Sequence, residues 1–77
     1  MLTIKILGSG CANCKKLETV AREAAAAANI QAEFIKVTDM KLIMNYDILS
    51  TPALVINEKV VSSGRIPTVA EVQGWLA

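Results

Sequence analysis

The sequence contains no histidine, and this absence excludes several kinds of active site. Nucleophilic catalysis by a histidine base and zinc sites with mixed cysteine and histidine ligands are both ruled out. The chain has only 2 cysteines, whereas a structural zinc ion takes four ligands and a small secreted domain needs several disulfides. The roles that remain for this pair are redox chemistry and the binding of a soft metal ion.

An excess of charge of either sign is also missing. The 8 basic and 7 acidic residues give a net charge of +1, so there is no electrostatic basis for binding nucleic acid or an anionic membrane. No apolar run is long enough to span a bilayer. The first residues alternate between apolar and polar like a strand, which is not typical of a signal peptide. We therefore expect a cytoplasmic protein.

Aromatic residues make up only 4% of the chain, although hydrophobic residues make up 53%. The core must therefore be aliphatic, with alanines at close contacts. The length of 77 residues allows one domain, residues 1–77, and a chain of this size buries only about 60% of its unfolded surface. For a small domain that is nearly neutral, a monomer is the expected state.

The hydrophobic pattern predicts four strands and three helices in the order β-α-β-α-β-β-α. The expected strands are Leu2–Leu7, Ile30–Val37, Ala53–Ile56 and Lys59–Ser62, and the expected helices are Ala12–Ala28, a short one after Thr38 or Asp39, and a last one with capping-box spacing at Thr68 and Glu71. The first three elements predict a parallel pair with a right-handed crossover, and Asn57-Glu58 predicts a hairpin turn. The result is an α/β fold, a four-stranded mixed sheet flanked by three helices, with helices on both faces.

The short second helix carries Met40, Ile43 and Met44 at helical spacing. This pattern predicts one apolar face, on which the methionines fill the core rather than bind a ligand.

Cys11-Ala12-Asn13-Cys14 lies where the first strand passes into the first helix. Unpaired N–H groups and the helix dipole stabilise a thiolate at such a position, and Lys15 and Lys16 add positive charge nearby. The three-residue step puts both sulfurs on one side of the first turn. We expect Cys11, at the exposed edge, to be the attacking nucleophile, and Cys14, one turn in and shielded, to be the resolving thiol.

A plainer interpretation is that the two cysteines only pack in the core, but a helix start after Gly-Ser-Gly is a poor place to bury both. A second signal is Ser50-Thr51-Pro52, directly before the apolar strand Ala53–Ile56. Proline cannot donate to a sheet ladder, so its position at a strand start is informative, although an ordinary trans proline could also begin the strand.

Three segments together resemble the thioredoxin and glutaredoxin superfamily: Gly10–Cys14, Ser50–Ala53 and Ser62–Gly64. The likeness covers Ile4 to Leu76 and is strongest to minimal thioredoxins, the small redox-active disulfide proteins. It implies a thioredoxin-like fold and a thiol–disulfide oxidoreductase that takes part in electron transport, with an intramolecular disulfide between the two cysteines and no further cofactor.

The resemblance also implies the surface that meets a disulfide-containing protein partner. The Thr51–Pro52 bond would be cis and lie against the disulfide, and the backbone of Thr51 would pair with an extended segment of the partner. Gly64 would leave room on the same surface, and Ala12 and Asn13, between the cysteines, would also contact the partner.

Two departures from the family pattern bear on mechanism. Lys5 stands where thioredoxins have a buried carboxylate, so proton transfer from Cys14 lacks its usual helper. Ser63-Gly64-Arg65-Ile66 lacks the aspartate and one glycine of the segment with which glutaredoxins hold glutathione. These differences favour a donor that resembles thioredoxin reductase over glutathione.

Two other functions stay open at this point. Heavy-metal-associated domains also place C-x-x-C after a first strand, where two thiolates hold a soft ion such as Cu(I). Their element order differs, they end on a strand, and they have no use for Thr-Pro. A redox-linked binding module, whose disulfide switches a partner without turnover, is compatible with every motif above.

Overall fold

The chain forms its elements in the order that the sequence predicts. The computed structural model describes residues 2–8, 12–48 and 50–76. Its elements are β1 (Leu2–Leu7), α1 (Ala12–Ala27), β2 (Ala32–Val37), α2 (Met40–Met44), β3 (Ala53–Ile56), β4 (Lys59–Ser63) and α3 (Val69–Leu76). Among these residues, no helix is both long and apolar enough to cross a membrane.

The end of α1 delays the start of β2, which begins at Ala32 rather than at Ile30. Asn29 takes a left-handed conformation with φ 56°. The N–H of Ile30 donates to the Ala25 carbonyl at 2.9 Å, and that of Asn29 to Ala26 at 3.1 Å. These two bonds close the helix in a Schellman arrangement, so Ile30 belongs to the cap and not to the strand.

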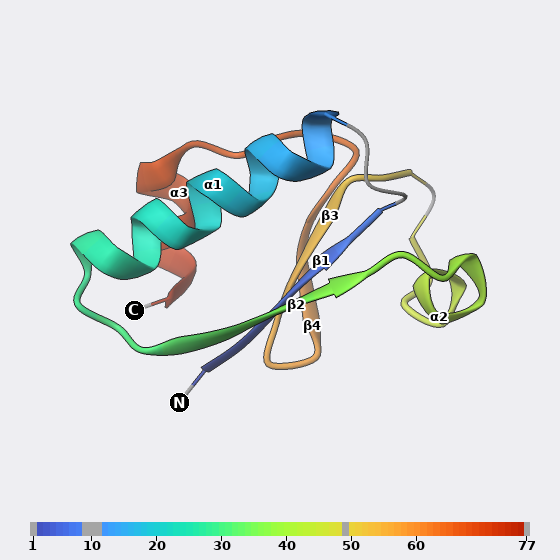
Figure 1. Cartoon of the computed structure of the whole chain (residues 1–77), viewed down its shortest axis with the longest axis horizontal. Coiled ribbons are helices and arrows are strands. Elements are labelled where there is room, and N and C mark those ends of the chain that lie inside the picture. Colours follow the sequence, from blue (N-terminus) through green and yellow to red (C-terminus); the bar gives the residue numbers. More distant parts are fainter. Residues whose placement is uncertain (1, 9–11, 49, 77) are drawn as a thin grey trace.

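The sheet has the strand order β2-β1-β3-β4 (Figure 1). β1 pairs parallel with β2 and antiparallel with β3, and β3 pairs antiparallel with β4. Asn57 and Glu58 join the last two strands with φ values of 50° and 68°. Two positive φ values are what a tight hairpin turn requires, and the predicted mixed sheet and hairpin are therefore confirmed.

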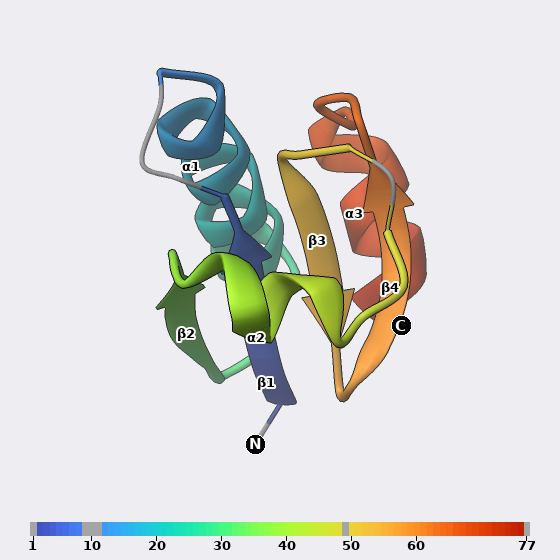
Figure 2. The same ribbon diagram turned by 90° about the vertical axis from the view of Figure 1, so that its right-hand side faces the viewer.

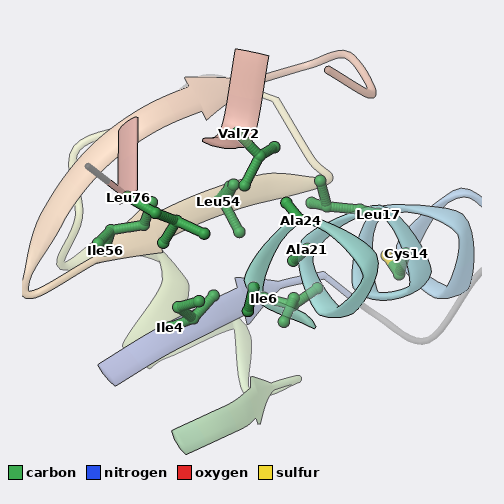
Figure 3. Close-up of a cluster of buried hydrophobic side chains, with 11 residues drawn as sticks. Ile4, Ile6, Cys14, Leu17, Ala21, Ala24, Leu54, Ile56, Val72 and Leu76 are labelled. Carbon is green, nitrogen blue, oxygen red and sulfur yellow. The ribbon is translucent and has the colours of Figure 1, made fainter. Parts of the chain in front are cut away.

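Helices cover both faces of the sheet, with α1 and α3 on one side and α2 on the other (Figure 2). The larger core lies under α1 and α3 and contains Ile4, Ile6, Leu17 and Leu54 (Figure 3). The smaller core lies under α2 and consists of Leu7, Ile43, Ala53 and Val55. In β1, Ile4 and Ile6 point into the larger core and Leu7 into the smaller one, because side chains on a strand point to opposite faces in turn.

The prediction that the methionines of α2 fill the core is wrong. Met40 is 57% exposed and Met44 is 70% exposed, while Ile43 between them is 2% exposed. The helix is only 5 residues long and is capped by Asp39, so little of its surface meets the sheet. Tyr46 and Ile48, which follow the helix, pack against the smaller core in place of the methionines.

Candidate functional site

Cys14 is the third residue of α1 and is 6% exposed. Figure 3 shows its side chain at one end of the larger core, on the turn of α1 beyond Leu17. The predicted shielding of Cys14 is thus confirmed. Cys11 lies outside the described residues, and its expected role as the attacking nucleophile stays a prediction.

The start of α1 carries no acidic side chain in its first turn. Ala12, Asn13, Lys15 and Lys16 are all exposed there. With no carboxylate among these residues, the helix dipole and the lysines both favour an anion at this end of α1. Cys14 is the residue of this turn that can supply one, as a thiolate.

One turn further along, Glu18 binds two cations. Its carboxylate accepts from Lys36 Nζ at 2.9 Å and from Arg22 Nε at 2.8 Å. The hydrogen bond from Lys36, followed by that from Arg22, lowers the pKa of Glu18 below its ordinary value. Glu18 is therefore ionised at neutral pH and joins α1 to β2 beside the cysteine.

A cavity of about 50 Å³ lies next to Cys14, lined by Ile6, Gly8, Cys14, Lys15, Glu18, Lys36 and Thr38. This volume is enough for water, while sites for organic ligands are several times larger. The side chain of Cys14 therefore lines a space large enough for water, which the Glu18–Lys36 ion pair also borders.

Gly8, at the end of β1, is the point where Cys14 and the Thr51–Pro52 segment meet. A β carbon placed on Gly8 would overlap the Sγ of Cys14 and would lie 3.9 Å from the Cβ of Thr51. The structure therefore brings Thr51 close to the sulfur of Cys14. The Thr51–Pro52 peptide bond is cis, the geometry that the resemblance implies. Thr51 is exposed and Pro52 is buried.

Gly64 lies beside the same segment. Its N–H donates to the Pro52 carbonyl at 2.9 Å, and its φ is 74°, a value that favours glycine. A β carbon at Gly64 would stand 2.5 Å from Ser50 Oγ. The position thus needs glycine because Ser50 occupies the space, a reason distinct from the room for a partner that the sequence suggested.

Lys5 has a structural partner on the other face of the sheet. Its ammonium group lies 2.5 Å from Glu58 and donates to the Tyr46 hydroxyl at 2.9 Å. The hydrogen bond to Glu58, followed by that to Tyr46, raises the pKa of Lys5 to about 12. Because Lys5 points to the face of the sheet that α2 covers, while Cys14 belongs to α1 on the opposite face, Lys5 takes no part in proton transfer at the sulfur.

A soft metal ion would need the thiolates of both cysteines. Of the residues that the structure describes, no group of three or more cysteine, aspartate or glutamate side chains is arranged to hold a metal ion. Cys11 lies outside the described residues, so the copper hypothesis for Cys11 and Cys14 stays a prediction.

Sequence reasoning missed the closeness of Gly8 to Cys14 and of Glu18 and Lys36 to the same cavity. Glu18 follows Cys14 by four residues, a spacing that places both on one face of a helix and could have given a signal. In the sequence, Gly8 stands out only as the first residue of the Gly-Ser-Gly before the helix.

Comparisons with known proteins agree on the fold. Solved structures with the same architecture include thioredoxin-2, a component of the malaria parasite protein secretion machinery, with a TM-score of 0.71 at 11% identity over 99% of this chain and 81% of that one. Oxidised thioredoxin from Plasmodium falciparum has a TM-score of 0.63 at 19% identity, over 99% of this chain and 82% of that one. These likenesses confirm the predicted thioredoxin-like fold.

Sequence comparison goes further than the fold. A thioredoxin of Methanothermobacter thermautotrophicus is 37% identical over the whole length of both chains. A thioredoxin of Methanocaldococcus jannaschii is 33% identical over 95% of this chain and 84% of its own. The family model described as a thioredoxin domain matches residues 2–77. The chain therefore belongs to the thioredoxin family of redox proteins.

Proposed function

We propose that this protein exchanges disulfides with protein partners through Cys11 and Cys14. The observation that carries the proposal is the location of Cys14, in the first turn of α1 and against Gly8, which Thr51 of the cis Thr51–Pro52 bond also approaches. A sulfur in the first turn of a helix, where that turn carries no acidic side chain, is suited to act as a thiolate. Family membership supports thiol–disulfide chemistry at this pair.

The exchange takes two steps. The thiolate of Cys11 attacks a disulfide of the partner, so one partner sulfur leaves as a thiolate and the other is bonded to Cys11. The thiolate of Cys14 then attacks the sulfur of Cys11, and the second partner sulfur leaves with its electron pair and takes a proton from water. The partner is reduced, and Cys11 and Cys14 are joined as a disulfide.

A second dithiol must return this disulfide to the reduced state. We propose a donor similar to thioredoxin reductase, with no bound cofactor in this chain and with the cytoplasm as the place of action. The partner would lie over the exposed residues of the site, which are Ala12, Asn13, Thr51 and Gly64. In a monomeric protein, no second subunit would cover this surface. An extended segment of the partner that pairs with the backbone of Thr51 would add affinity without requiring a particular amino-acid sequence in that segment.

The two cysteine variants test this division of roles. Cys14→Ser should still attack a protein disulfide and then remain covalently joined to it, because no thiol is left to release the partner. Cys11→Ser should form no such adduct. Mass spectrometry after acid quenching measures both outcomes. An adduct formed by Cys11→Ser, or faster alkylation of Cys14 than of Cys11 in the reduced protein, would contradict the assignment.

A further inference from the structure

We propose that Gly8 is a positioning residue that fixes the sulfur of Cys14 for the release of the partner. The inference rests on the proposed function, since it concerns the second step of the exchange. Gly8 does not contact the reacting atoms of the partner, and it acts only through Cys14.

The contact between Gly8 and Cys14 is closer than any side chain at position 8 would permit. A β carbon built on Gly8 overlaps Cys14 Sγ and stands 3.6 Å from Cys14 Cβ. The sulfur of Cys14 therefore occupies the space that a side chain at position 8 would fill.

Nothing in the backbone of Gly8 requires glycine. Among the described glycines, the left-handed conformation is found at Gly64 and not at Gly8. An alanine at position 8 would thus meet no strain in φ, and the sulfur is the one atom that a β carbon there would overlap. The absence of a side chain at Gly8 serves the position of Cys14.

The strand cannot easily move away from an added methyl group. The N–H of Gly8 donates to the Val37 carbonyl at 2.9 Å, which extends the pairing of β1 with β2 by one residue. The helix is equally fixed, since Leu17 on its next turn is 0% exposed and packs in the larger core. In a Gly8→Ala variant, we expect Sγ to be the atom that is displaced, since it can move by rotation of one side-chain bond.

The displaced sulfur has a space to enter. The cavity of about 50 Å³ beside Cys14 is bordered by Gly8 and by the Glu18–Lys36 ion pair. We therefore expect Gly8→Ala to fold, with the sulfur turned toward this cavity and away from its native position.

Position matters at the release step because thiolate attack needs alignment. The Cys14 thiolate must approach the sulfur of Cys11 in line with the bond from Cys11 to the partner, so that the partner thiolate leaves as the new disulfide forms. A displacement of about 1 Å at a reacting atom can slow a step about a hundredfold. The first attack uses Cys11 and the partner alone, so it does not depend on Cys14.

The test compares Gly8→Ala with Gly74→Ala, a matched change at a helical glycine that has no atom within 4 Å of its β carbon position. Quenched-flow mass spectrometry follows the formation and decay of the mixed disulfide with a protein substrate. We expect Gly8→Ala to slow decay about 10- to 100-fold and to change formation less than about twofold. Gly74→Ala should change neither rate. Unchanged decay in Gly8→Ala would overturn the proposal.

A second measurement does not depend on the proposed function. The stability cost of Gly8→Ala is measured by urea denaturation of the reduced protein, once with Cys14 present and once in a Cys14→Ala background. The cost should fall when the sulfur is removed, and if Gly8→Ala does not fold, the double variant should. An equal cost in both backgrounds would show that the sulfur is not the group displaced. If the wild type forms no mixed disulfide while the cost still depends on the sulfur, the proposed function fails and the contact stands.

Discussion

Helices α1 and α3 pack against each other on one face of the sheet, and their third residues have opposite roles. In α3 this residue is Glu71, whose N–H donates to Thr68 Oγ1 at 3.1 Å and whose carboxylate accepts from the Thr68 N–H at 3.1 Å. In α1 the third residue is Cys14, and the first turn carries no acidic side chain.

The start of α3 is stabilised by side-chain caps, whereas the start of α1 is suited to the chemistry of a thiol. At α3, two orphan N–H groups are satisfied by side chains, and Arg65 holds Glu71 with two hydrogen bonds of 3.1 and 2.8 Å. At α1, a sulfur stands where α3 has a carboxylate, so the field of the helix acts on a thiol. Three substitutions test whether the two helix starts differ in this way.

The largest effect is expected from Thr68→Ala, which removes the cap of α3. The free energy of unfolding should fall by about 1 kcal/mol, because the Glu71 N–H loses its partner. Urea denaturation measures the loss. Thr19→Ala is the control, since its hydroxyl bonds to the Lys15 carbonyl within α1 and alanine is a better helix former. A change in the reduction potential of Thr68→Ala would mean that the two helix starts are not independent.

Asn13→Asp should make the start of α1 more like that of α3. A carboxylate in the first turn should stabilise the helix by about 0.3–1 kcal/mol and disfavour a thiolate nearby. Alkylation of Cys14 in a Cys11→Ser background should therefore slow at neutral pH, by roughly two- to fivefold for that energy. Asn13→Ala, which adds no charge, should leave the rate unchanged. Faster alkylation of Asn13→Asp would contradict the electrostatic account.

The smallest effect concerns acid stability at α3. The hydrogen bonds from Arg65, first, and from the Thr68 backbone lower the pKa of Glu71 to about 2. A lowered pKa stabilises the folded state above the ordinary pKa of a glutamate, and this contribution is lost as the pH falls from there toward 2. The urea midpoint should therefore decrease less between pH 5 and pH 2 in Glu71→Gln than in the wild type. Equal decreases would show that the exposed pair contributes nothing.

The parts of the fold that sequence alone predicted depend on local patterns. Each of these patterns depends only on residues that are close together in the sequence. They are the alternation in Leu2–Leu7, the four buried residues of Ala53–Ile56 and the capping box at Thr68. The burial of Cys14 followed in the same way from its place one turn into α1.

The errors and omissions concern contacts between segments. Periodicity gives the apolar face of α2 but not how much of that face reaches the sheet, so Met40 and Met44 were wrongly expected to be buried. The close approach of Gly64 to Ser50 joins two loops that are distant in sequence. The direction in which Lys5 points depends on the register of β1 against its neighbours. None of these contacts leaves a pattern in the sequence.

The most direct test is a redox titration of Cys11 and Cys14 across defined thiol–disulfide buffers, with the alkylated thiols counted by mass. We predict a reversible two-electron transition to an intramolecular disulfide, at roughly −270 to −200 mV as in thioredoxins and glutaredoxins. A pair that stays reduced across the whole series would contradict disulfide exchange, and titration with Cu(I) would then test the same two thiols as metal ligands.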